Sequence, residues 1–300
     1  MTAGKMEQPT PVVLSMDVDD TNEYPSEYRL RIGNGVKYLK VEPNTFTADE
    51  LVFPVPSLPP LPYDDENWTV AQISRDSDSG NINTTLSNLP LAGVQNVWHE
   101  VSVNVLDLER TAQLTGCTFE AVRPWKGSPG DVNPHVIAKI ARFEWEIPSI
   151  ERETRAYQIF EQQRAADLAP RFLGHIREGS RIMGLFLEKV TDCDHAGEAD
   201  LEACKLALGS LHRLGLLHGD VNRHNMLVRH NEGRSLVKLI DFEHFKEGVS
   251  EEMRRQELQR LKAELVDTSG RGGRVPVASH RRLKDCGCSA VYTSTCIIMP

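Results

Sequence analysis

The first hundred residues alternate apolar and polar positions in short runs, the pattern of β-strands. Residues 28–41 surround Gly33-Asn34-Gly35 and predict a hairpin, and residues 68–74 predict another strand. The prolines in residues 53–68 predict an extended connector, because proline disfavours a helix interior. We therefore expect a β-rich appendage over residues 25–109, which carries no candidate chemistry. Residues 1–24 hold more carboxylates than lysines and predict a disordered acidic arm.

From about residue 110 the pattern alternates between strands and helices. An amphipathic helix with period 3.6 is predicted from Pro148 to Asp167, and a second over residues 197–217. A charged helix is predicted over residues 250–266, and residues 269–300 have the composition of a loose tail. The predicted strands lie between these helices, at residues 117–122, 135–143, 171–178 and 181–190, with a later hairpin around Asn231-Glu232-Gly233.

Charge and composition exclude some functions. The net charge of −9 argues against a general nucleic-acid binder, whose footprint is a basic face. No run of residues has the length of a signal peptide core or of a membrane span, so we expect a cytoplasmic protein without a stable membrane anchor. Six cysteines in 300 residues do not form a disulfide scaffold. The sequence does not indicate an oligomeric state.

The first candidate for chemistry is Lys139, which stands among apolar residues in the strand "VIAKI". A lysine there is costly unless it is paired, although an edge lysine facing solvent is the ordinary alternative. In the next predicted helix, Glu153 shares the apolar face of Ile150, Tyr157 and Phe160. Glu153 is therefore the expected partner of Lys139.

Two polar motifs later in the chain complete the candidate set. In "HGDVNRHN", Asp220 is placed to accept a hydrogen bond from a substrate hydroxyl, and Asn225 is placed to bind Mg²⁺. His218 is expected to support the turn. Asp241 ends a strand in "LIDFE" and is the second expected Mg²⁺ ligand. Taken alone, "HGDVNRHN" is equally a turn with polar caps. The strand "LFLEKV" suggests that backbone groups near Glu188 and Val190 meet an adenine ring.

In this order, the lysine, the glutamate, H-G-D-x4-N and D-F-E resemble the protein-kinase-like superfamily over residues 110–268. "HGD" and "DFE" are most similar to aminoglycoside and choline kinases. "PSIERETRAYQIF" and "DTSGRGG" resemble compact fungal kinase-like proteins. The resemblance implies an α+β, two-lobed fold, with an N-lobe over residues 110–190 and a truncated C-lobe over residues 191–268. It also implies that Lys139 contacts ATP phosphates and that Glu153 holds Lys139.

The chain also departs from the family pattern. No G-x-G-x-x-G loop precedes Lys139; Gly116 alone stands near the expected place. Asn222 occupies the position at which protein Ser/Thr kinases commonly carry lysine, and no A-P-E motif follows Asp241. These departures favour a small-molecule hydroxyl as acceptor for an ATP- and Mg²⁺-dependent kinase. They also leave open an inactive pseudokinase that binds nucleotides or partners without turnover.

Overall fold

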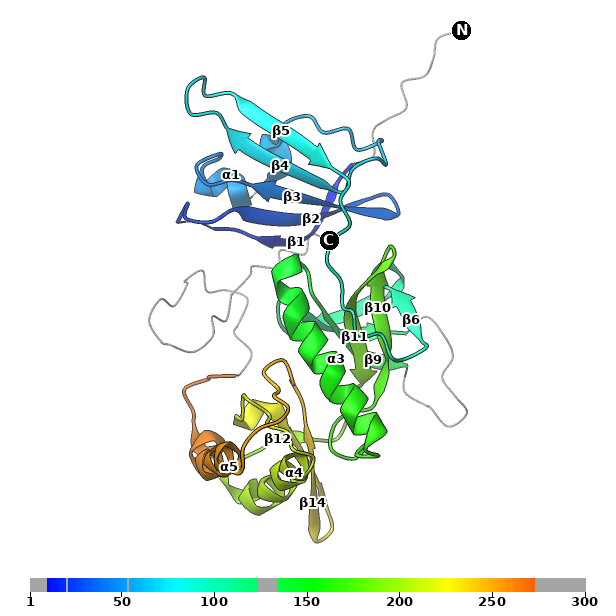
Figure 1. Cartoon of the computed structure of the whole chain (residues 1–300), viewed down its shortest axis with the longest axis vertical. Coiled ribbons are helices and arrows are strands. Elements are labelled where there is room, and N and C mark those ends of the chain that lie inside the picture. The colour runs from blue at the N-terminus through cyan, green and yellow to red at the C-terminus, as the bar shows by residue number, and fades with distance from the viewer. Residues whose placement is uncertain (1–9, 20, 53, 124–133, 273–300) are drawn as a thin grey trace. The chain divides into compact units, whose positions relative to one another are not determined.

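The computed structural model describes residues 10–19, 21–52, 54–123 and 134–272 (Figure 1). These residues fall into two compact units, one ending at Ala92 and the other beginning at Gly93. Both units combine strands and helices, so the predicted mixed α+β class is confirmed. No helix in the described ranges is long and apolar enough to cross a membrane.

The first unit is a five-stranded sheet in which the strands follow one another in sequence order. Strands β3 and β4 are parallel, and the other neighbours are antiparallel. The predicted hairpin is confirmed, because Ile32 pairs with Gly35 across the β2–β3 turn. The elements are β1 (Val12–Asp17), β2 (Ser26–Ile32), β3 (Gly35–Val41), α1 (Ala48–Val52), α2 (Pro54–Ser57), β4 (Val70–Arg75) and β5 (Ile82–Ser87).

Two expectations for this unit were wrong in part. Residues 12–17 form β1, paired with β2, instead of belonging to a disordered arm. The Asp19 carboxylate accepts hydrogen bonds from the backbone amides of Glu23 and Tyr24 at 2.8 and 2.7 Å, so an acidic residue here stabilises a turn. The proline-rich connector includes the short helix α2, which begins at Pro54, because the first position of a helix tolerates proline.

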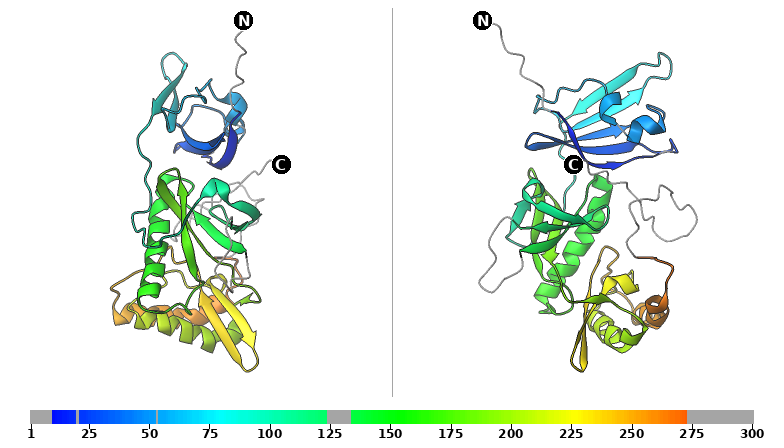
Figure 2. Two further views of the ribbon diagram at one scale, coloured as in Figure 1. Left: turned by 90° about the vertical axis from the view of Figure 1, so that its right-hand side faces the viewer. Right: turned by 180° about the vertical axis from the view of Figure 1, so that it is seen from behind.

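The second unit is built on a six-stranded sheet with the order β6-β10-β11-β9-β8-β7. Only β6 and β10 are parallel, and helix α3 packs against β11 (Figure 2). The predicted appendage ended at residue 109, but β6 belongs to this sheet; three residues are too few to give a strand signal. The elements are β6 (Ser102–Asn104), η1 (Val105–Asp107), β7 (Glu109–Gln113), β8 (Thr118–Val122), β9 (His135–Ile140), η2 (Glu144–Glu146), α3 (Ile147–Gln162), β10 (Phe172–Glu178) and β11 (Arg181–Glu188).

A three-stranded sheet and two helices complete the second unit. The strand order is β12-β13-β14, and helix α4 packs against both β14 and α5. The apolar side chains of both sheets join one core, which includes Phe119, Leu185, Leu211 and Phe242. The elements are β12 (Asp194–His195), η3 (Glu198–Asp200), α4 (Leu201–Arg213), η4 (Arg223–Asn225), β13 (Met226–Asn231), β14 (Arg234–Leu239) and α5 (Glu251–Val266).

Candidate active site

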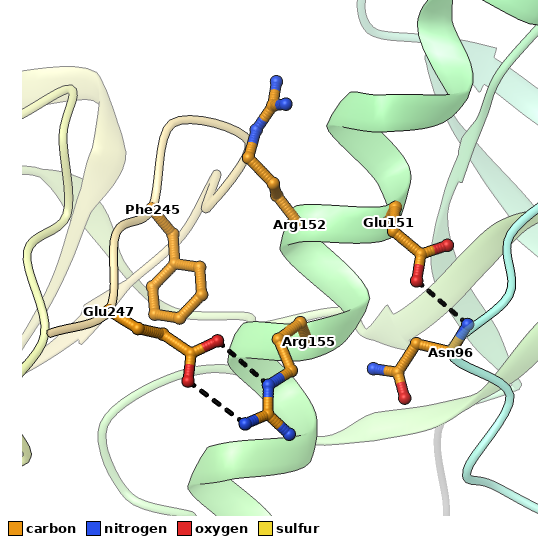
Figure 3. A pocket seen from close by; sticks show the side chains of 6 residues that line it. All are labelled: Asn96, Glu151, Arg152, Arg155, Phe245 and Glu247. Carbon is orange, nitrogen blue, oxygen red and sulfur yellow. Dashed lines mark hydrogen bonds and ion pairs between the residues drawn. The ribbon is translucent and has the colours of Figure 1, made fainter.

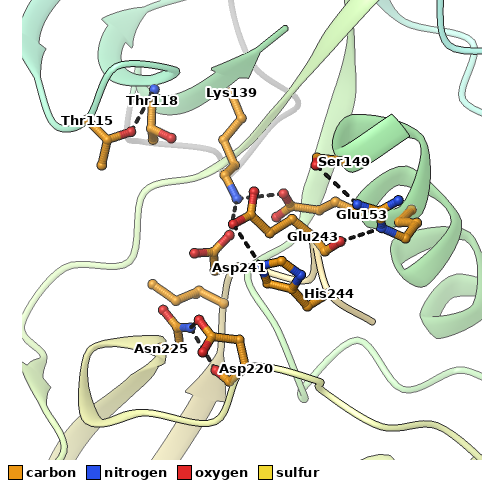
Figure 4. A network of polar contacts seen from close by, with 12 residues as sticks. Thr115, Thr118, Lys139, Ser149, Glu153, Asp220, Asn225, Asp241, Glu243 and His244 are labelled. Carbon is orange, nitrogen blue, oxygen red and sulfur yellow. Dashed lines mark hydrogen bonds and ion pairs between the residues drawn. The ribbon is translucent and has the colours of Figure 1, made fainter. Parts of the chain in front are cut away.

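Lys139 lies in β9, where its neighbours across the sheet are Thr118 of β8 and Leu185 of β11. Only 13% of its side chain is exposed, and 1% of that of Glu153 on α3. The Lys139 Nζ atom lies 2.5 Å from Glu153 Oε2 (Figure 4). Buried charges of opposite sign require such pairing, because neither is solvated by water. The structure therefore brings together the lysine and the glutamate that the sequence paired.

Asp241 follows β14 and is the second partner of Lys139. Its Oδ1 atom lies 2.7 Å from Lys139 Nζ, across 102 positions of sequence. Asp241 has a φ of +69°, an uncommon conformation for a residue other than glycine, and one that clusters at functional sites. About a third (34%) of its side chain remains exposed, so the carboxylate is still reachable from solvent.

The three charges strongly affect one another's protonation. Burial alone would lower the pKa of Lys139, but the Asp241 and Glu153 carboxylates raise it well above its usual value. Burial raises the pKa of Glu153 to about 7 despite the opposing effect of Lys139. Burial would also raise the pKa of Asp241, but Lys139 lowers it. Lys139 is therefore a fixed cation, and Asp241 is its firmly ionised partner.

The turn that carries Asp220 is held by two carboxamides. Asn222 Oδ1 caps η4 by accepting from the backbone amides of His224 and Asn225 at 2.9 and 3.2 Å. The Nδ2 atoms of Asn222 and Asn225 each donate to Asp220 Oδ2 at 3.1 Å. Both contacts fix the orientation of the Asp220 carboxylate. Within the described ranges, no residue donates to its Oδ1 atom, which remains available to a ligand.

His218 connects this turn to the Asp241 segment. Its ring is fully buried, and burial lowers its pKa, so the ring is neutral. His218 Nε2 lies 3.0 Å from the Ile240 carbonyl oxygen, which requires the tautomer that carries the proton on Nε2. This contact agrees with the supporting role expected for His218.

Glu257 of α5 also holds the turn, and sequence reasoning missed it. Its carboxylate accepts from the backbone amides of Gly219 at 2.8 Å and His218 at 3.3 Å, and it lies 2.7 Å from His212 Nε2. Burial would raise the pKa of Glu257, but these partners lower it. Glu257 precedes buried Leu261 and Leu265 by four and eight positions, so it is an acidic residue on a buried helix face. The same signal had identified Glu153.

The β7–β8 turn lies next to the strand of Lys139, and its Thr115 and Thr118 appear at the upper left of Figure 4. The amides of Leu114 and Thr115 both donate to the Thr118 carbonyl oxygen at 2.9 Å, and the Thr118 amide donates to Thr115 Oγ1 at 3.1 Å. A Cβ atom on Gly116 would lie 3.1 Å from the Arg142 guanidinium. Internal hydrogen bonds therefore already use two amides of this turn and the first amide of β8.

Helix α3 is tied to the segment that follows Asp241. Arg155 binds both Glu247 oxygens at 3.0 and 3.1 Å, and Arg152 Nε donates to the Glu243 carbonyl oxygen at 2.5 Å (Figures 3 and 4). Beside these contacts lies an open pocket of about 270 Å³ that Phe245 helps to line. The contacts fix Glu153, on the same helix, relative to Asp241.

One known protein family matches the part of the chain that carries Asp220, Asn225 and Asp241. The sequence model of the Lipopolysaccharide kinase (Kdo/WaaP) family matches residues 187–274, less than a third of the chain. That family is a member of the protein-kinase-like superfamily. This part of the chain is kinase-like. The match contains Asp220, Asn225 and Asp241, whereas Lys139 and Glu153 precede it. No curated protein matches the chain.

The kinase-like match confirms the predicted superfamily resemblance and suggests a phosphotransferase. A closer relation to aminoglycoside, choline or fungal kinase-like proteins stays a prediction, as does the two-lobed arrangement. The kinase family also implies the use of ATP, typically with Mg²⁺. The roles assigned to individual residues stay predictions, although the structure places five of them in two adjoining clusters.

The predicted Mg²⁺ ligands have side-chain oxygens of the kind that Mg²⁺ binds, and they lie on adjoining segments. The Ile240 amide donates to the Asn225 carbonyl oxygen at 3.0 Å, which places Asn225 beside the Asp241 segment. Asn225 donates through Nδ2, so its Oδ1 atom is left as an oxygen ligand. One carboxylate and one amide oxygen, completed by water and phosphate, suit Mg²⁺. In the described ranges, no cluster of three or more His, Cys, Asp or Glu residues offers a different metal site.

Glu188 and Val190 were predicted to contact the cofactor, and the structure does not bring them into the Lys139 cluster. The Glu188 amide donates to the Arg171 carbonyl oxygen at 2.9 Å, and the Val190 carbonyl oxygen accepts from the Cys193 thiol at 3.7 Å. Both residues line a separate cavity at the end of β11. A backbone contact with an adenine ring stays a prediction.

Proposed function

We propose that the chain transfers the terminal phosphoryl group of ATP to a hydroxyl group of a small molecule. The observation that carries this proposal is the position of Lys139 Nζ, 2.5 Å from Glu153 and 2.7 Å from Asp241. These partners come from a helix and from the end of a distant strand. In protein kinases, the ion pair between the lysine and the helix glutamate and the Mg²⁺-binding aspartate must both be in place.

Each residue has a defined task in this proposal. Lys139 contacts the α- and β-phosphates, and Glu153 holds it there. Asp241 and Asn225 hold Mg²⁺, which neutralises phosphate charge when bound. Asp220 accepts the hydrogen bond of the acceptor hydroxyl, whose oxygen forms the new bond to phosphorus as the bond to the ADP oxygen breaks. The two carboxamides on Asp220 Oδ2 leave Oδ1 for that hydrogen bond.

A small-molecule acceptor agrees with the surroundings of Asp220. Asn222 is 2% exposed, and its amide is fully used by Asp220 and by η4. This position therefore presents no positive charge to a peptide substrate, as a lysine would. The matched family is named for kinases of lipopolysaccharide, which is also not a protein.

The test is ADP release from Mg·ATP by the full chain, across a panel of sugars, amino alcohols and choline-like alcohols. We expect one acceptor class to raise ADP release above the acceptor-free rate. Asp220→Asn should lower that rate by about 10²–10⁴-fold, the usual contribution of a positioned base. His230→Gln, an exposed change in β13, is the control. An unchanged rate in Asp220→Asn would remove Asp220 from the mechanism.

A second candidate is a pseudokinase that binds nucleotides or a partner without turnover. It is favoured by the β7–β8 turn, because internal hydrogen bonds use two of its amides and the first amide of β8, which are then not free to bind phosphate. A thermal shift with Mg·ATP, without ADP release from any acceptor in the panel, would favour this candidate. At a hundred times Kd, a ligand adds about 2.7 kcal/mol of stability, which is readily measured.

A further inference from the structure

A second, smaller cavity in the second unit is lined by nine described residues, of which four are lysine or arginine. Its volume is about 180 Å³, and it lies between the connector that follows β11 and strands β9, β10, β13 and β14. The cations are Arg171, Lys189, Arg229 and Lys238, and Glu188 is the only carboxylate among the described residues that line the cavity. None of these residues has been given a role in phosphoryl transfer, apart from the predicted backbone contact at Glu188.

Two of the cations are bonded to neutral oxygens. Lys238 Nζ donates to the Ala169 carbonyl oxygen at 2.8 Å, and Arg229 Nη2 donates to the Thr191 carbonyl oxygen at 2.6 Å. Neither side chain forms an ion pair with a residue in the described ranges. Both are partly buried, and Arg229 Nε has no hydrogen-bond partner there. Neither positive charge is therefore held in a direct ion pair with a carboxylate in the described ranges.

The other two cations, Lys189 and Arg171, lie beside carboxylates. Lys189 pairs with Glu120 at 2.8 Å, and the Glu188 carboxylate accepts from the backbone amide of Arg171 at 3.3 Å. Lys238 and Arg229, without ion pairs in the described ranges, therefore keep two positive charges in this cavity, in a chain whose net charge is −9. Gathering like charges in a partly buried cavity is costly unless an anion neutralises them.

We propose that this cavity binds a phosphate-type oxyanion. Guanidinium and ammonium groups are the side chains that bind phosphate by charge-assisted hydrogen bonds. A volume of about 180 Å³ is below the roughly 300–1,000 Å³ of cavities for drug-sized ligands. It suits one phosphate group with its bridging waters, either free or carried on a larger molecule. The site is distinct from the Lys139 cluster and uses none of its residues.

Isothermal titration of the full chain with inorganic phosphate, in chloride of constant ionic strength and without Mg²⁺, tests the proposal. We expect saturable binding by the wild type and by Lys139→Met, which alters the other anion-binding cluster. Lys238→Gln and Arg229→Gln should each weaken binding by at least tenfold. Arg260→Gln removes a charge from the exposed face of α5 and should bind as the wild type does.

Unchanged binding in both cavity variants would overturn the proposal, as would the absence of saturable binding by the wild type. Loss of binding in Lys139→Met alone would assign the phosphate to the other cluster and contradict the proposal. If Lys238→Gln does not fold, Arg229→Gln decides. A parallel titration with glycerol phosphate separates the two sources: binding of phosphate alone indicates a free anion, whereas binding of both indicates a phosphate on a larger ligand.

Discussion

Lys139 shows how a buried charge organises its surroundings. An ammonium group with 13% of its side chain exposed loses much of its hydration, and two carboxylates, one on α3 and one after β14, replace the lost water. Because burial raises the pKa of Glu153 to about 7 while that of Asp241 is lowered, the two partners are not equivalent. Asp241 carries the firm negative charge, and Glu153 is the partner whose charge is more easily lost.

The free energy of unfolding should depend on pH through His175. It is fully buried in β10, and burial lowers its pKa from 6.5 to about 4, with a smaller effect of His99. The unfolded chain therefore binds more protons, so stability is complete above pH 6.5 and falls as the pH drops towards 4. The loss is at most about 3 kcal/mol, at 1.36 kcal/mol per pKa unit.

Urea unfolding of His175→Gln between pH 7 and 4 measures this contribution. The variant should lose less stability than the wild type over that range, because glutamine does not titrate. His230→Gln, at a side chain that is 56% exposed, should keep the wild-type slope. Equal slopes in His175→Gln and the wild type would show that His175 is not the group responsible.

The turn from His218 to Asn225 is an element held from three sides. Asn222 caps η4, His218 contacts the Ile240 carbonyl oxygen, and Glu257 accepts two backbone amides from α5. Such backbone anchoring orients Asp220 before any substrate binds. The position of Asp220 thus depends on a helix that begins 31 residues after it.

Glu257→Gln should loosen this turn. The amide keeps the shape of the carboxylate but loses charge-assisted hydrogen bonds, each worth about 1.5–3 kcal/mol. We expect a loss of roughly 2 kcal/mol in unfolding free energy at pH 7, together with a larger fall in kcat than in substrate affinity. Glu252→Gln, on the exposed face of the same helix, is the matched control.

The pH profile separates a specific role of Glu257 from a general loss of stability. Because its pKa is lowered in the folded state, its contribution is complete above about pH 4.5 and is lost as the pH falls through the folded value. Glu257→Gln should therefore flatten the acid side of the stability curve. A parallel downward shift at every pH would contradict this assignment.

Elements with a strong hydrophobic period could be predicted from the sequence, and each element that was missed has a physical explanation. Glu153 was found because an acidic residue on an apolar helix face must have a buried partner. Strand β6 was missed because three residues carry no period, and β1 because its acidic neighbours suggested disorder. The pairing of Lys139 with Asp241 was not predicted, since no local pattern relates residues 102 positions apart.

At the scale of the whole molecule, the two units have separate hydrophobic cores. Trp68 and Leu39 belong to the first, and Phe119 and Leu185 belong to the second. The second unit is anchored from its first residues, because the Val94 amide donates to the Ile182 carbonyl oxygen at 2.8 Å. Units with their own cores generally fold independently.

We therefore expect the fragment 93–275 to fold alone. Urea unfolding should show one cooperative transition with the circular dichroism of a mixed α+β protein. If the proposed function is correct, the fragment should also bind Mg·ATP as the full chain does. A fragment without a cooperative transition would show that the second unit depends on residues outside it.

Calorimetric titration of the full chain with Mg·ATP shows whether the Lys139 cluster binds the phosphates of ATP. We expect saturable binding by the wild type, a loss of at least tenfold in affinity in Lys139→Met, and wild-type affinity in Arg260→Gln. Circular dichroism of each variant checks that it is folded. Equal affinity of the wild type and a folded Lys139→Met, or no binding by the wild type, would show that the Lys139 cluster does not bind the phosphates of ATP.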